Sequence, residues 1–272
     1  MKHLAEMWFT RCEASVRYPF TSGSYADVVT DILAILEVEV ASLPAGAKIA
    51  SEHELMARFD ATRSTVRRVI EQMESRFLVR RAHGAGTFVN RRVDYLISSA
   101  IAPSLHTTVE RAGASARTFV VDASEQPLPA EIAQRIGFKA GIPCTRLVRV
   151  GYIDDDPATC AEEWVLPGVL DHVDVSLRAI ESLTEVLRAS RRTPVRAWSR
   201  VSTEFPPASI AERLELRVPV TTWHLETLTR DGNAGPPLLC SRSWMRQDRM
   251  RVVIEFDTPL APPADPNTSS SA

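Results

Sequence analysis

Basic side chains concentrate in one short part of this sequence, residues 58–92. That stretch contains nine arginines and only three acidic residues, whereas the whole chain carries a formal net charge of −2. The arginine fork matches the O6 and N7 atoms of guanine, and its charge neutralises phosphate groups. A basic stretch in a mildly acidic chain therefore indicates a surface that contacts nucleic acid.

The residues in and around this stretch predict two short helices with a turn between them. Ser51 lies three residues before Glu54, which is the spacing of a capping box, and the segment Asp60–Thr62 predicts a turn that ends in an N-cap. The second helix carries an apolar stripe at three- and four-residue steps: Val66, Val69, Ile70, Met73 and Phe77. Its opposite side carries Arg63, Ser64, Arg67 and Arg68, near the end of a recognition helix that normally reaches base edges.

A basic hairpin follows the second helix. Residues 78–81 and 87–89 predict two strands, and the sequence His83-Gly84-Ala85-Gly86 predicts the turn, where glycine permits left-handed backbone and close approach to DNA. Together these elements predict a winged helix-turn-helix. An amphipathic helix with exposed arginines is also a common solvated surface, so the helix alone leaves both interpretations open.

Residues 25–89 resemble the DNA-binding domain of the GntR family of bacterial transcription regulators. The motifs that carry the resemblance are Ser51-Glu52-x-Glu54-Leu55, Thr62-Arg63-x-Thr65-Val66-Arg67 and Gly84-x-Gly86-Thr87-Phe88-Val89. The resemblance implies that DNA is contacted by Thr62, Arg63, Ser64, Thr65, Arg67, His83, Gly84 and His53, with Arg63 reading a base. The sequence departs from the family pattern at Ala50, at His53 and at Arg76, which replaces a glycine between helix and wing.

The second part of the chain predicts an α+β domain with a largely antiparallel sheet. Strands are expected at residues 117–122, 144–153, 159–166, 195–205, 221–229, 238–245 and 252–256, and helices at 129–136, 182–188 and 210–216. Two turn signals, Asp154-Asp155-Asp156-Pro157 and Asp231-Gly232-Asn233, join neighbouring strands into hairpins. Strands in hairpins with helices between them are typical of such a sheet.

This part resembles the UTRA effector domain found in the HutC branch of the GntR family. Ser104-Leu105, Leu147-Val148-Arg149, Ser182-Leu183 and Arg246-x-Asp248-Arg249 carry the resemblance. It implies a small anionic effector, such as a phosphate, phosphonate or organic acid, contacted by Ser104, Arg149 and Ser182. Gly151 and Leu239 stand where sugar-phosphate binders tend to have an arginine and a nearby glutamate, which argues against that ligand class. A structural salt bridge is the alternative role for Arg149.

The length of 272 residues fits two domains. We expect an N-terminal arm at 1–24, a winged helix-turn-helix domain at 25–90, a linker at 91–97, an effector-binding and dimerisation domain at 98–258, and a disordered tail at 259–272. The four cysteines lie far apart, which favours reduced thiols over disulfides. No secretory signal or membrane-spanning run is evident, so the sequence predicts a cytoplasmic protein.

Enzyme motifs are missing: the sequence contains no Gly-x-Ser-x-Gly elbow, P-loop or His-Glu-x-x-His helix. The run Asp154–Asp156 could bind a divalent cation, but a solvated hairpin tip is the preferred interpretation, and no metal site or cofactor is expected. The prediction is a ligand-responsive repressor, not an enzyme, that binds an inverted-repeat operator in double-stranded DNA as a homodimer. The alternative is a small-molecule-binding or catalytic domain that carries a vestigial DNA-binding module.

Overall fold

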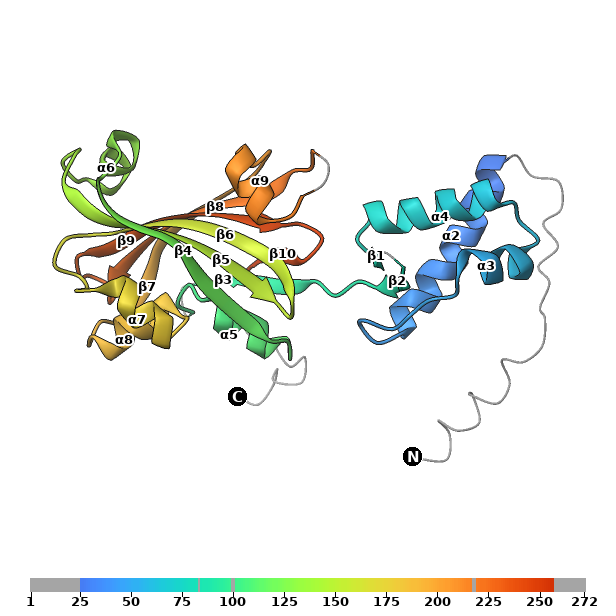
Figure 1. Ribbon diagram of the computed structural model, residues 1–272, viewed down its shortest axis with the longest axis horizontal. Coiled ribbons are helices and arrows are strands. Elements are labelled where there is room, and N and C mark those ends of the chain that lie inside the picture. Colours follow the sequence, from blue (N-terminus) through green and yellow to red (C-terminus); the bar gives the residue numbers. More distant parts are fainter. Residues whose placement is uncertain (1–24, 83, 99–100, 217–218, 257–272) are drawn as a thin grey trace, which may run out of the picture. The chain divides into compact units, whose positions relative to one another are not determined.

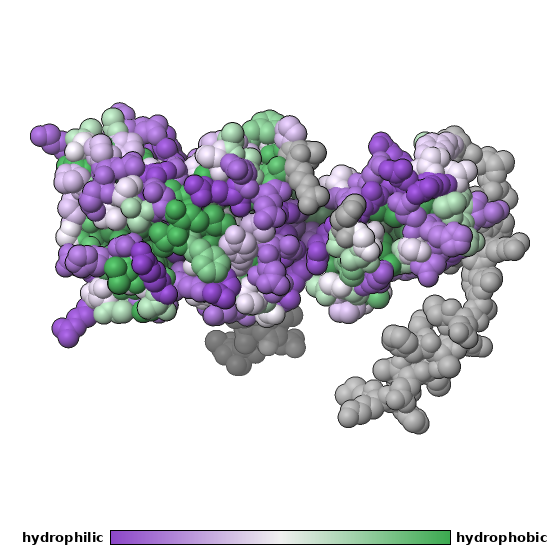
Figure 2. All heavy atoms as spheres, viewed as in Figure 1, coloured by the Kyte–Doolittle hydropathy of each residue, from purple (hydrophilic) through white to green (hydrophobic). Residues whose placement is uncertain are grey.

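The computed structural model describes residues 25–82, 84–98, 101–216 and 219–256. The chain divides into two compact units, residues 1–92 and residues 93–272. On the face drawn in Figure 2, hydrophilic residues cover most of the described surface of each unit, with smaller apolar patches between them. Within the described residues, no helix is both long and apolar enough to span a bilayer.

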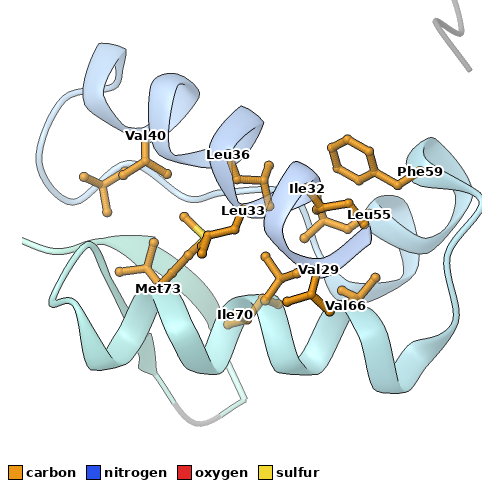
Figure 3. Packing of buried hydrophobic residues seen from close by; sticks show 13 residues of the cluster. Val29, Ile32, Leu33, Leu36, Val40, Leu55, Phe59, Val66, Ile70 and Met73 are labelled. Atoms are coloured by element: carbon orange, nitrogen blue, oxygen red, sulfur yellow. The ribbon is translucent and has the colours of Figure 1, made fainter. Parts of the chain in front are cut away.

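The described residues of the first unit form three helices and a two-stranded hairpin. They are α2 (Tyr25–Ser42), α3 (Glu52–Phe59), α4 (Arg63–Ser75), β1 (Val79–Ala82) and β2 (Gly86–Val89). Four members of the apolar stripe predicted for α4 pack in the core with α2 and α3: Val66, Val69, Ile70 and Met73 (Figure 3). The fifth, Phe77, lies beyond the end of the helix and is only partly buried. Burial of Val66 and Ile70 to 1% exposure fixes which side of α4 faces solvent.

The junction between α4 and the wing differs from the expectation in its backbone. Arg76, where the family resemblance would put glycine, has an ordinary φ of −92°, and Phe77 takes the left-handed conformation at φ 58°. The backbone N–H of Phe77 donates to the carbonyl of Glu74 at 2.9 Å, and the N–H of Leu78 donates to the carbonyl of Met73 at 2.9 Å. These two hydrogen bonds define a Schellman motif. The left-handed position is therefore one residue later than the substituted glycine, and Arg76 is accommodated without backbone strain.

The second unit is built on a six-stranded antiparallel sheet in the order β4-β5-β6-β9-β8-β7. Its strands are β4 (Ala116–Pro127), β5 (Pro143–Ile153), β6 (Asp156–Val165), β7 (Pro194–Glu204), β8 (Thr222–Asp231) and β9 (Pro237–Arg246). The predicted hairpins are present: β5 pairs with β6, and β8 pairs with β9. The α+β fold with a largely antiparallel sheet is thus confirmed, although β4 is longer than predicted.

Helices cover both faces of this sheet (Figure 1). On one face lie α5 (Leu105–Arg111), α7 (Val173–Ala179) and α8 (Leu183–Ala189), and on the other lie α6 (Ala130–Ile136) and α9 (Ala208–Arg213). The core is divided in the same way, since Leu147, Val165 and Leu239 pack against α7 and α8. Cys144, Trp164 and Cys240 pack against α6 on the opposite face.

Two strands outside the main sheet correct the expected linker. Residues 93–97, predicted as part of a connection between domains, form β3 (Val93–Ile97), which pairs in parallel with β10 (Met250–Ile254). Asp94 and Arg251 form a bidentate ion pair across this ladder, at 2.7 and 2.9 Å. The partner strand is more than 150 residues away in sequence, so a local pattern could not reveal the pairing.

Candidate functional site

The N-terminal end of α4 is organised by hydroxyl groups. Thr62 is the N-cap, as predicted, and its Oγ1 accepts from the backbone N–H of Thr65 at 3.2 Å. The same Oγ1 lies 2.9 Å from Ser64 Oγ and 2.8 Å from Thr65 Oγ1. Thr65 is only 4% exposed, and its hydroxyl lies against the cap residue; its contact with DNA stays a prediction. Thr62 and Ser64 remain on the exposed side.

Three arginines of α4 are exposed: Arg63, Arg67 and Arg68. The side chain of Arg63 is 74% exposed, and its nearest carboxylate oxygen, in Glu52 of α3, lies 3.5 Å from Nε. Arg67, one turn further along, is also exposed. An exposed ion pair of this kind contributes little free energy, so Arg63 can leave Glu52 to reach a base. His53, beside Glu52 in the first turn of α3, is exposed as well.

The wing arginines are not equivalent. Arg81 Nε lies 3.2 Å from a Glu74 oxygen, and Arg81 Nη2 lies 4.0 Å from Glu52. Burial raises the pKa of Glu74, and the neighbouring Arg81 opposes that shift. Arg80 instead lies over the Phe88 ring, 5.7 Å from its centroid, and is exposed. Arg80 is therefore the freer of the two charges for a phosphate group.

The wing turn contains two glycines with positive φ, at +73° for Gly84 and +124° for Gly86. A Cβ on Gly86 would lie 2.7 Å from Lys48 Cε, whereas a Cβ on Gly84 would meet nothing within 4 Å. The backbone of Lys48 forms an isolated β-bridge with Phe88, and Lys48 Nζ would lie 3.3 Å from a Cβ on Gly86, which places its ammonium group beside the wing turn. The sequence analysis missed Lys48 because it precedes the helix-turn-helix by several residues. His83 lies outside the described residues.

In the second unit, Ser104, Arg149 and Ser182 line the same cavity, which has a volume of about 90 Å³. The structure thus brings together the three predicted residues, which come from β5 and from the starts of α5 and α8. Ser104 Oγ accepts from Thr107 N–H at 3.2 Å, and Ser182 Oγ accepts from Glu185 N–H at 3.4 Å. Each hydroxyl caps a helix, and its hydrogen is left to donate to a ligand.

Arg149 already has a carboxylate partner in this cavity. Its Nε and Nη2 donate to the two oxygens of Glu163, at 2.5 and 2.7 Å, and its Nη1 donates to the Glu181 carbonyl at 3.2 Å. The side chains of Arg149 and Glu163 are only 13% and 8% exposed. The structural salt bridge and the cavity position are therefore both present, and Glu163 is a site residue that the sequence analysis missed.

Gly151 shows why a second arginine is missing from the cavity. A Cβ at this position would lie 2.3 Å from Leu105 Cδ2 and 2.5 Å from Thr159 Oγ1. A side chain on residue 151 would therefore require the Leu105 and Thr159 side chains to move. Leu239, the second departure from sugar-phosphate binders, is buried and packs with the α7 and α8 core while lining the same cavity.

Polar groups without a charge complete the cavity wall. Among the described residues, Thr118 Oγ1 is buried and has no hydrogen-bond partner. Tyr95 on β3 contributes its ring, and its hydroxyl accepts from Arg196 Nη2 at 3.3 Å. Burial raises the pKa of Tyr95 and lowers the pKa of His106, which keeps both groups neutral near pH 7.

The candidate cation site at the β5–β6 turn is occupied by protein groups. Asp156 pairs with Arg249 at 3.1 Å, and Asp154 accepts a hydrogen bond from the Ser115 backbone at 3.2 Å. The remaining cysteines of the described chain, Cys144, Cys160 and Cys240, are buried free thiols. Cys12 lies outside the described residues.

Comparisons with known proteins also divide the chain into these two domains. Residues 30–89 match the family model described as bacterial regulatory proteins, gntR family, and residues 111–251 match the UTRA domain model. The HTH-type transcriptional regulator GgaR of Escherichia coli K12 is 30% identical over 171 residues, covering 62% of this chain and 67% of that protein. The HTH-type transcriptional regulator Rv0792c of Mycobacterium tuberculosis is 26% identical over 196 residues, covering 70% and 71%.

A solved structure shares the fold. The crystal structure of PhnF from Mycobacterium smegmatis aligns with a TM-score of 0.54 at 21% identity, covering 83% of this chain and 98% of that one.

Proposed function

Because this chain belongs to the GntR family of bacterial regulatory proteins and carries a UTRA domain, we propose that it is a repressor whose operator affinity is set by a small anionic metabolite. The regulator class follows from the family. The convergence of Ser104, Arg149 and Ser182 in one cavity supports the proposed effector site. The exposed side of α4, with Arg63 and Arg67, supports direct reading of DNA.

The proposed DNA partner is an inverted-repeat operator bound by a homodimer. One short recognition helix covers only a few base pairs, so useful specificity requires two copies related by a two-fold axis. The DNA-contacting residues we propose are Thr62, Arg63, Ser64 and Arg67 on α4, with His53 and the wing tip. Thr65 is proposed to position the helix start, because its side chain is buried.

A gel-shift with the DNA upstream of this protein's own gene tests the regulator directly. We expect a retarded complex that contains two protein chains and that disappears when the inverted repeat is scrambled. Sedimentation that shows a monomer at micromolar concentration, still binding one half-site tightly, would contradict the homodimer. A protein that binds small molecules but no DNA would favour the alternative function, a ligand-binding or catalytic domain with a vestigial DNA-binding module.

The effector site is tested by Arg149→Ala. Because ligand and operator sites are separate, the ligand must favour one arrangement of the DNA-binding domains over another. The variant is expected to keep its ligand-free operator affinity and to lose the response to ligand. Because Arg149→Ala leaves the buried Glu163 carboxylate without its partner, the double variant Arg149→Ala with Glu163→Gln is measured alongside it. A folded variant of either kind that still responds to ligand contradicts the proposed role of Arg149.

A further inference from the structure

The bidentate pair between Arg149 and Glu163 raises a question about the charge of the effector. The guanidinium neutralises Glu163 through Nε and Nη2, so the pair presents no net charge to the cavity. If Arg149 served only to bind an anionic ligand, its Nε and Nη2 would have no carboxylate partner in the protein. Here a carboxylate of the protein already holds it, and both side chains are more than four-fifths buried.

A simple anion meets two costs at this site. If it binds beside the intact pair, it is repelled by the adjacent carboxylate in surroundings where charges are weakly screened. If it displaces Glu163, it leaves a buried carboxylate without a partner, which is strongly unfavourable. A ligand that brings its own hydrogen-bond donor avoids the second cost, because the donor replaces Arg149 at Glu163.

The neighbourhood of Glu163 fits such a ligand. On the sheet, Glu163 lies directly opposite Ser241 of β9, and both side chains line the cavity. Thr118 adds a buried hydroxyl without a partner among the described residues, and the capping serines add two more hydroxyl groups. Gly151 supplies no second cation, and Leu105 fills the space beside it. The cavity thus offers many hydroxyls and one internally neutralised cation.

We propose that Glu163 is a specificity-determining residue, and that the effector joins an acidic group, bound by Arg149, to a hydroxyl or amino group that donates to Glu163. This rests on the proposed effector cavity. Hydroxy acids and amino acids belong to this class. Compact anions without a donor do not.

Sulfate is the probe that isolates the role of Glu163, because it is a compact anion that does not titrate near neutral pH. Saturable thermal stabilisation by sodium sulfate is measured against sodium chloride of equal ionic strength. Wild type is expected to show none at low millimolar sulfate. Glu163→Gln keeps the side-chain size but removes the competing charge, so its sulfate affinity should exceed that of wild type by about tenfold or more.

Glu162→Gln is the matched control. Glu162 neighbours Glu163 in sequence but points to the other face of the sheet, where it pairs with Arg146 outside the cavity. It should behave like wild type towards sulfate. Equal sulfate affinity in the two variants overturns the proposal. Saturable binding of low millimolar sulfate by wild type overturns it as well, and this measurement needs no variant to fold.

The ligand class is tested with pairs of compounds that differ by one donor, such as succinate and malate. Wild type should bind malate with about fivefold or higher affinity than succinate. In Glu163→Gln this ratio of the two affinities should be smaller. Wild type that binds succinate as tightly as malate contradicts the proposal. Gel-shifts of ligand-free proteins are run in parallel. Failure of wild type to bind any operator refutes the proposed regulator, while the sulfate comparison still decides the role of Glu163.

Discussion

Replacement of Arg63 by alanine removes the side chain that we expect to read a base. Arg63 projects from the first turn of α4, is 74% exposed at its side chain, and contacts only the edge of Glu52 at 3.5 Å. The fold should not suffer, because neither the cap of α4 nor its apolar face uses this side chain. The change therefore isolates recognition from stability.

The expected magnitude follows from geometry and symmetry. One bidentate arginine–guanine contact discriminates by about 1–3 kcal/mol, and two half-sites double this to about 2–6 kcal/mol, or at least about thirtyfold in affinity. Release of Arg63 from Glu52 lowers the net gain by about 1 kcal/mol at most, because an exposed pair contributes little. Arg63→Lys keeps the charge but lacks the fork, so it should lose most of the same preference.

Fluorescence anisotropy with a labelled operator, and with every single base-pair substitution of one half-site, measures this effect at several salt concentrations. For Arg63→Ala, the penalty for substituting one particular guanine should vanish while the penalties at other positions remain. Arg80→Ala provides the contrast: it should weaken all sequences alike and reduce the salt slope by about one charge per site. Arg68→Ala, on the same helix but paired with Glu71, serves as the control.

The assignment is refuted if Arg63→Ala weakens every operator variant by the same factor and also lowers the salt slope. That pattern would make Arg63 a phosphate contact. Equal loss of specificity in Arg63→Ala and Arg80→Ala would likewise mean that the roles are wrongly divided between helix and wing.

Three further predictions concern stability and reactivity. Gly86→Ala should destabilise the DNA-binding domain by about 2–3 kcal/mol in urea unfolding, against about 1 kcal/mol for Gly84→Ala. The reason is that the φ of +124° at Gly86 lies outside the left-handed helical region, whereas the φ of +73° at Gly84 lies near it. Equal costs would contradict this difference in backbone strain. Gly151→Ala should cost about 1–3 kcal/mol by overpacking against Leu105, and calorimetry showing no loss would mean that α5 shifts freely. Burial raises the pKa of the Cys240 thiol to about 12. Iodoacetamide at pH 8 should therefore leave Cys240 unmodified in the native protein and alkylate it in urea, as measured by mass spectrometry. Rapid alkylation of Cys240 in the native protein would contradict its burial.

Local signals predicted the DNA-binding domain well. The capping box of Ser51 and Glu54 and the cap at Thr62 depend on residues three apart in sequence, and both are present. The family resemblance supplied two further expectations. It put Thr65 among the DNA contacts, and the structure adds that this side chain is buried beside the cap. It also put the left-handed position at Arg76, whereas the Schellman hydrogen bonds place it at Phe77.

Long-range partners limited the prediction of the second domain. The strand at residues 93–97 has its partner at residues 250–254, so nothing nearby in sequence indicated a ladder. Arg149 was found through its motif, but its counter-ion was not. Strand alternation allows either Glu162 or Glu163 to face the cavity, and only the register of β5 against β6 decides for Glu163.

The pairing of β3 with β10 limits where the second domain can be fused to another DNA-binding domain. Five consecutive residues of each strand are in register, and β3 begins directly after the first unit ends. A chimaera joined between Arg92 and Val93 carries the whole ladder with it. One joined at residue 98 leaves β10 as an uncovered edge and removes Tyr95 from the cavity wall. DNA-binding domains are therefore best exchanged at a junction after residue 92, before the strand that the sequence suggests is a linker.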